Sequence, residues 1–105
     1  MNMKTKEDKD ILSLKELKLI IKPILNEKGI FDIYLFGSYA RGEANKNSDV
    51  DIYCEHGNVK NLYDVFDLNE NLKKALNKNV DIIFKDSKLE KEFENNLKKD
   101  LIKLC

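Results

Sequence analysis

A pair of acidic residues behind a Gly-Ser turn is the part of this sequence best suited to chemistry. Asp49 and Asp51 flank Val50, and ten residues separate Asp49 from Gly37-Ser38. Because side chains in a strand alternate between its two faces, both carboxylates are expected on the face opposite Val50. Adjacent carboxylates repel each other unless a cation lies between them, and oxygen-only ligands suit Mg²⁺. The spacing therefore predicts that Asp49 and Asp51 bind a metal ion opposite a turn that could hold phosphates.

A third acid, Asp81, lies within an apolar run, residues 80–84, that is typical of a strand. An acid beside buried strands must be paired, protonated or bound to a cation. If this strand lies next to the one that contains Asp51, Asp81 completes a cluster of three carboxylates. Such a cluster could hold a second metal ion and accept a proton from a nucleophile. The competing interpretation of each acid is a solvent-facing residue at a strand edge, which is uncommon for paired Asp residues within a strand.

The turn and the loop between these acids contain further candidates. Gly37 and Ser38 offer backbone amides and a hydroxyl to a polyphosphate, although a Gly-Ser pair alone is too common to be informative. Arg41 is the single arginine among 19 basic residues, and its planar guanidinium suits forked hydrogen bonds. Two roles are open for Arg41: it binds phosphates, or it braces the loop through nearby acids. Ser48 is a candidate nucleotide ligand whose simpler role is to cap the start of the next strand.

Alternating helices and strands are expected to position these residues. Capping boxes at Ser13–Glu16 and Ser87–Glu90 predict the starts of two helices, the first ending at Gly29 with Pro23 kinking or dividing it. A further helix is predicted over residues 61–77 and a short helical turn over 38–42. The strands are predicted over residues 30–36, 49–54, 80–84 and, as a short edge strand, 101–104.

This order of elements predicts one small α/β (α+β) domain, residues 1–105, with residues 1–12 flexible and a single mixed sheet packed by helices mainly on one face. The 36% of charged residues balance to a net charge of zero, which argues against direct nucleic-acid binding through bulk electrostatics. No signal peptide or membrane-spanning run is apparent. Cys54 and Cys105 fit neither a metal site nor a disulfide framework, so we expect reduced thiols and a cytoplasmic protein.

Four pieces in a fixed order carry a resemblance to the nucleotidyltransferase superfamily typified by DNA polymerase beta: Gly37-Ser38, Arg41-Gly42, Asp49-Val50-Asp51 and Asp81. The short chain narrows the resemblance to the minimal nucleotidyltransferase (MNT) proteins, and the likeness covers most of the chain. It implies the nucleotidyltransferase fold and an enzyme that moves a nucleoside monophosphate from an NTP to an acceptor. The spaced combination is specific, although each piece alone is weak.

The resemblance also implies roles for individual residues. Asp49 and Asp51 would hold the Mg²⁺ ions, two in number, and Asp81 would assist as base and metal ligand. Gly37 and Ser38 would bind the triphosphate. Nothing in the motif suggests an inactive enzyme.

The resemblance finally implies a partner. Many MNT proteins are antitoxins encoded beside a HEPN-type ribonuclease toxin, which they neutralise by transferring AMP from ATP to a tyrosine of the toxin. A chain without a second domain for the acceptor favours a protein that brings its own hydroxyl. Two alternatives stay open: transfer to a small molecule or an RNA end, and a non-catalytic antitoxin that masks its partner. An exposed last strand would also allow the domain to associate with a second copy or with a partner.

Overall fold

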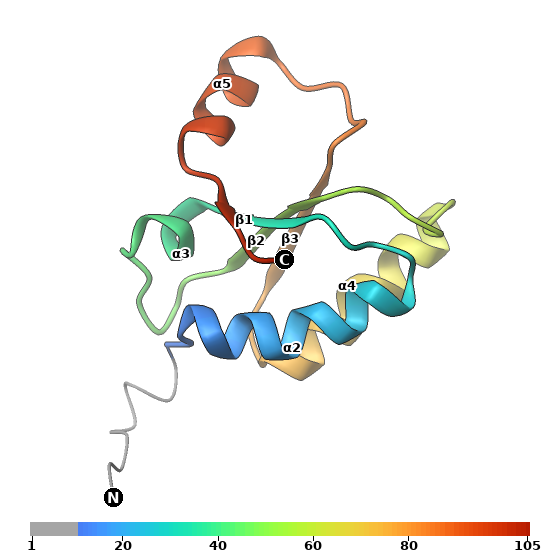
Figure 1. Ribbon diagram of the computed structural model, residues 1–105, viewed down its shortest axis with the longest axis horizontal. Helices are drawn as coiled ribbons and strands as arrows, with labels where there is room; N and C mark the ends of the chain where they lie inside the picture. Colours follow the sequence, from blue (N-terminus) through green and yellow to red (C-terminus); the bar gives the residue numbers. More distant parts are fainter. Residues whose placement is uncertain (1–10) are drawn as a thin grey trace, which may run out of the picture.

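The computed structural model describes residues 11–105, so the predicted flexible segment, residues 1–12, lies almost wholly outside the described residues. Helices and strands alternate in the predicted order (Figure 1). The helices are α2 (Leu14–Glu27), α3 (Gly37–Arg41), α4 (Leu62–Leu76) and α5 (Lys91–Lys99). The strands are β1 (Ile33–Phe36), β2 (Val50–Cys54), β3 (Val80–Phe84) and β4 (Ile102–Lys103).

The four strands form one mixed sheet, as predicted, in the order β3-β2-β1-β4. β1 is antiparallel to both β2 and β4, whereas β2 and β3 are parallel. The tail of the chain is the short edge strand that the sequence predicted. This order places β2, with Asp51, between the strand that leads into the Gly-Ser turn and the strand that contains Asp81.

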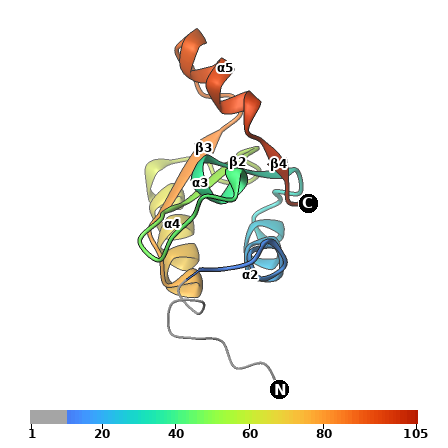
Figure 2. The ribbon, with the colours of Figure 1, turned by 90° about the vertical axis from the view of Figure 1, so that its left-hand side faces the viewer.

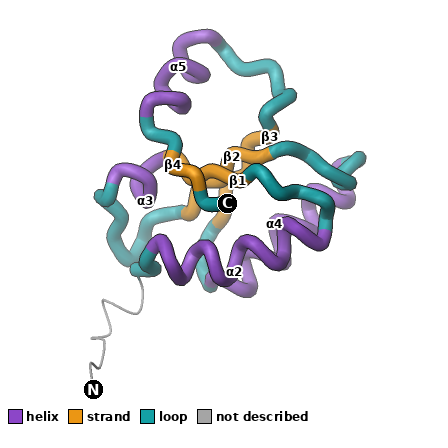
Figure 3. Tube along the Cα trace, viewed as in Figure 1, coloured by secondary structure: helices purple, strands orange, loops and turns teal. Residues whose placement is uncertain are grey.

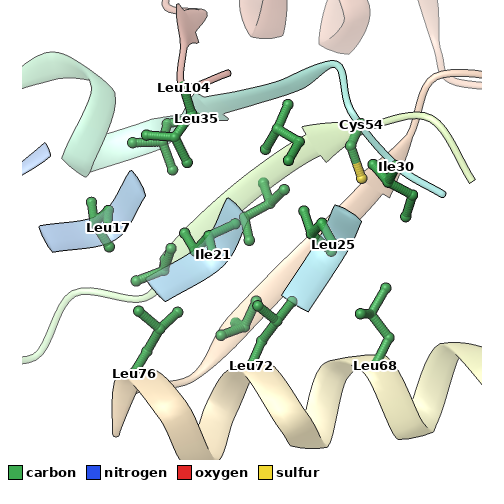
Figure 4. Packing of buried hydrophobic residues seen from close by; sticks show 14 of the residues in the cluster. Leu17, Ile21, Leu25, Ile30, Leu35, Cys54, Leu68, Leu72, Leu76 and Leu104 are labelled. Carbon is green, nitrogen blue, oxygen red and sulfur yellow. The ribbon is translucent and has the colours of Figure 1, made fainter. Parts of the chain in front are cut away.

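The two long helices, α2 and α4, lie together against one face of the sheet, and α5 lies on the other side (Figures 1, 2 and 3). The spacing of their apolar residues explains this layer, because leucines and isoleucines at i and i+4 form a stripe along each helix. Figure 4 shows these stripes packed against alternate residues of β1 and β2. The fully buried members of the core on these elements are Leu17, Ile21, Leu25, Ile33, Leu35, Val50, Ile52, Cys54, Leu68 and Leu72.

The ends of α2 follow the sequence signals closely. The side chain of Ser13 accepts a hydrogen bond from the Glu16 amide, and the Glu16 carboxylate accepts one from the Ser13 amide, which completes the predicted capping box. Gly29 follows the helix with a φ of +74°. The helix is continuous through Pro23, so the alternative in which proline divides it is wrong. Pro23 lies on the exposed side of the helix.

The second predicted capping box is wrong. α5 begins at Lys91, after a Glu90 N-cap whose side chain makes no capping hydrogen bond. The Ser87 amide instead donates to the Phe84 carbonyl. Residues 85–90 therefore form a connection from β3 to the helix, because the turn that closes β3 engages Ser87 first.

The two serines form a matched pair for a stability test. Ser13→Ala is expected to lower the free energy of unfolding by about 1 kcal/mol, because the Glu16 amide loses its acceptor. Ser87→Ala, which has the same Ser-x-x-Glu spacing but lacks the capping contacts, is expected to change it by less than about 0.5 kcal/mol. Urea unfolding followed by circular dichroism measures both. Equal costs for the two variants would contradict the assignment.

Two strands begin later than predicted. β1 starts at Ile33 because Ile30 is engaged at the end of α2, where its amide donates to the Leu25 carbonyl. β2 starts at Val50, so Asp49 lies just before the ladder. Among the described helices, none has both the length and the apolar character that crossing a bilayer requires.

Candidate active site

Asp51 and Asp81 lie side by side on the sheet face that points away from α2 and α4. They are direct partners in the parallel ladder between β2 and β3. Their neighbours Val50, Ile52 and Val80 are buried against the helices, so the alternation of side chains directs both carboxylates to the opposite face. The prediction that the two acid-bearing strands are neighbours is therefore confirmed.

The carboxylate of Asp51 has a strongly shifted pKa. Burial raises this pKa to about 6, with the adjacent charge of Asp81, a hydrogen bond between the two side chains and the charge of Asp49 adding to the shift. Arg41 opposes it. A half-buried carboxylate whose pKa is raised by burial and by neighbouring acids is a candidate functional group.

Asp49 lies immediately before β2 and is exposed. It raises the pKa of Asp51 through its charge, whereas Asp81 also contributes a hydrogen bond. Within residues 11–105, no three acidic, His or Cys side chains are arranged closely enough to hold a metal ion as they stand. The carboxylates of Asp49, Asp51 and Asp81 fit Mg²⁺, because this ion prefers oxygen ligands. A bound cation would also lower the raised pKa of Asp51.

Gly37 lies directly against Asp51. Its preceding residue, Phe36, pairs with Asp51 across the antiparallel ladder, and a Cβ atom at Gly37 would overlap the Asp51 Oδ2 atom. Its φ of +72° is also in the left-handed region that favours glycine. The next residue, Ser38, lies in the first turn of the short helix α3, and its carbonyl accepts a hydrogen bond from the Glu43 amide at 2.9 Å. The Gly-Ser turn and the acids thus meet at one point, as the spacing suggested.

Arg41 forms two ion pairs with carboxylates. Its Nε atom lies 3.2 Å from Glu43 Oε2, and its Nη1 atom lies 3.5 Å from Asp100 Oδ2. Of the two roles left open by the sequence, these contacts are those of a brace between α3 and the end of α5. Asp100 could not be singled out from the sequence, because it is one charged residue of a charged helix end, far along the chain from Arg41.

Ser48 is engaged within its own loop. Its Oγ atom accepts a hydrogen bond from the Asn45 amide at 2.8 Å, and its amide donates to the Asn45 carbonyl at 3.0 Å. This reciprocal pair closes the turn that precedes Asp49 and β2. These contacts are those of the simpler, capping role that the sequence allowed.

The fold and this site define a class of protein. The family model for the nucleotidyltransferase domain matches residues 14–104. The chain therefore belongs to the nucleotidyltransferase domain family, as the motif had indicated.

Individual relatives narrow the comparison. The chain is 40% identical to a putative protein adenylyltransferase of Methanocaldococcus jannaschii, over 69% of this chain and 77% of the relative. It is 38% identical to the protein adenylyltransferase MntA of Thermococcus cleftensis, over 73% of this chain and 82% of the relative. One chain of a solved toxin–antitoxin structure with AMP-PNP superimposes with a TM-score of 0.72 at 26% identity, covering 84% of this chain and 72% of the other.

Proposed function

We propose that this chain is a Mg²⁺-dependent protein adenylyltransferase that transfers AMP from ATP to a tyrosine of a cognate HEPN-type toxin and thereby acts as an antitoxin. The observation that carries the proposal is the position of Asp51, with Asp81 beside it on β3 and Gly37 against it at the end of β1. The protein adenylyltransferase relatives and the toxin–antitoxin structure with AMP-PNP support the choice of reaction and partner.

Each side chain then has a distinct task. Asp49, Asp51 and Asp81 would hold the Mg²⁺ ions, which when bound neutralise phosphate charge during an in-line displacement. Gly37 and Ser38 would contact the triphosphate. The acceptor oxygen forms a bond to the α-phosphorus, the bond from that phosphorus to the bridging oxygen breaks, and diphosphate leaves. Asp81 is exposed, so its carboxylate is accessible to take the proton of the acceptor hydroxyl.

Arg41 and Ser48 contribute indirectly in this proposal. Arg41 holds the turn through Glu43 and Asp100, and Ser48 shapes the loop that leads to Asp49. Both keep the groups around Asp51 in place.

The test uses ATP, Mg²⁺ and the protein encoded by the neighbouring reading frame, which this proposal expects to be a HEPN-type toxin. We expect intact-mass spectrometry to show that the toxin gains one or more AMP residues, and that chelating the metal prevents the gain. In cells, the chain should protect against the toxin, and Asp49→Ala/Asp51→Ala should lose both protection and transfer, by at least about 10³-fold for the transfer rate.

A matched control removes two acids, as Asp49→Ala/Asp51→Ala does, but at positions outside the site. Asp64→Ala/Asp67→Ala removes two acids near the start of α4, outside the site, and should retain protection and transfer. If Asp49→Ala/Asp51→Ala protects as well as the unmodified chain, the protein masks its partner by binding and the catalytic proposal is wrong.

A further inference from the structure

A pocket of about 380 Å³ opens beside Asp49, where β2 and β3 begin. The loop before β2, the end of α4 and the turn before β3 form its walls. Three lysines and one acid line it together with Ser48 and three asparagines; the charged residues are Lys46, Asp49, Lys73 and Lys78. We call this site the lysine pocket. No sequence pattern marks this pocket, because three of 18 lysines carry no local signal that they lie close together in the fold.

The residues that line the lysine pocket carry more positive than negative charge. None of the three lysines forms an ion pair with a carboxylate in this part of the chain. The Lys78 Nζ atom donates to the Lys46 carbonyl at 3.1 Å, which holds one ammonium group at the wall. Three ammonium groups against the single carboxylate of Asp49 make the pocket complementary to an anion.

The position of the pocket relative to the strands shows where it adjoins the proposed site. Gly37 lies beyond Asp51 on the β1 side, and Asp81 lies beyond it on the β3 side. If the triphosphate is held at the Gly-Ser turn, an in-line displacement requires the acceptor to approach from the side opposite the leaving diphosphate. The wall of the lysine pocket that is formed by residues 77–79 leads directly into β3. The pocket therefore adjoins the proposed site at Asp49, and a substrate that reaches the Asp49 carboxylate can extend into it.

We propose that the lysine pocket recognises carboxylate side chains that flank the acceptor tyrosine of the protein substrate. This inference rests on the proposed function for its choice of acceptor. A peptide segment is favoured over a nucleic acid, because the pocket has room for a few side chains and the chain as a whole has a net charge of zero. The pocket would thus select the acceptor, while the carboxylates beside it carry out the transfer.

The test measures binding and transfer separately with two fluorescein-labelled peptides. Both contain one tyrosine, flanked by glutamates in one and by glutamines in the other. Fluorescence anisotropy should show about tenfold tighter binding of the glutamate peptide at low salt, as two or three exposed ion pairs would give. The difference should narrow as the salt concentration rises. With Mg²⁺ and ATP added, transfer to the glutamate peptide should be faster by a similar factor.

Variants that neutralise lysines test whether the difference between the two peptides arises in the lysine pocket. Lys46→Gln/Lys73→Gln/Lys78→Gln should abolish the difference between the peptides and leave the affinity for ATP unchanged. The control Lys15→Gln/Lys18→Gln/Lys22→Gln removes the same charge from the exposed surface of α2 and should keep the difference. Circular dichroism checks that both variants are folded.

The outcomes separate the two proposals. Equal binding of the peptides, or a difference that survives in the pocket variant, overturns the lysine pocket as an acceptor site. Tighter binding of a single-stranded RNA oligonucleotide than of the glutamate peptide, lost in the pocket variant, overturns it in favour of a nucleic-acid acceptor. A lysine-dependent difference in binding with no transfer to the toxin or to either peptide supports the pocket and counts against the adenylyltransferase function.

Discussion

Replacing Asp51 with Asn is expected to remove nucleotidyl transfer and, in the same protein, to stabilise the metal-free fold at pH 7.5. The loss of activity, by about 10³-fold or more, follows from removing the central carboxylate of the proposed metal site. The gain in stability follows from the surroundings of this carboxylate. It is half-buried, beside Asp81, and its pKa is raised to about 6. Asparagine has nearly the same shape and carries no charge to desolvate or repel.

The pH dependence of this effect has a definite sign. In the unfolded chain Asp51 has a pKa of about 3.9, below the value of about 6 in the folded protein, so the folded state binds the proton more tightly. The favourable contribution of protonated Asp51 is present at low pH and is lost as the pH rises through about 6. Above that pH the ionised carboxylate costs about 1 to 2 kcal/mol after solvent screening of a partly exposed group.

Urea unfolding at two pH values measures this cost. Asp51→Asn should raise the free energy of unfolding by about 1 to 2 kcal/mol at pH 7.5, and the gain should fall towards zero below about pH 3, where this carboxyl group is protonated in both states. The control Asp67→Asn removes an exposed carboxylate on α4 whose nearest cation, Lys28, is 3.8 Å away, and should change stability by less than about 0.5 kcal/mol. A loss of stability in Asp51→Asn at pH 7.5 would show that the carboxylate is not a repelled, half-buried charge.

Local patterns were sufficient for much of the fold. The apolar run that predicted a strand over residues 80–84 corresponds to β3, and the prediction over residues 61–77 corresponds to α4 with its Asn61 and Asn77 caps. The neighbouring positions of Asp51 and Asp81 could be anticipated as well, because an acid within an apolar strand needs a partner or a cation. In each case the determining interactions are local or follow from alternation along a strand.

What the sequence could not provide depends on contacts between distant segments. The pairing of Arg41 with Asp100 requires the end of α5 to return to α3. The second capping box failed because a turn at the end of β3 engaged Ser87 before a helix could begin there. The contact between Gly37 and Asp51 depends on the register of β1 against β2, and alternation within the strands does not exclude a shift of this register by two residues.

The contact between Gly37 and Asp51 is expected to have the second large effect on stability and activity. Comparing Gly37 with Gly42, which has nearly the same backbone conformation, isolates this effect. Gly37 and Gly42 have φ values of +72° and +73°, so alanine should cost about 1 kcal/mol at either position through backbone strain. A Cβ atom at Gly42 would meet nothing within 4 Å, whereas at Gly37 it would overlap the Asp51 Oδ2 atom. Gly37→Ala should therefore cost about 1 to 3 kcal/mol more than Gly42→Ala.

The activities of the two variants should differ more than their stabilities do. Gly37→Ala must displace the Asp51 carboxylate, and a shift of that kind costs about 100-fold in transfer rate, whereas Gly42→Ala should retain most of the rate. A double-mutant cycle confirms the cause: in an Asp51→Ala background the overlap disappears, so Gly37→Ala should cost no more stability than Gly42→Ala. If Gly37→Ala remains the costlier change in that background, the requirement for glycine comes from the backbone alone, and Gly37 has no part in placing the carboxylate on which the proposed chemistry depends.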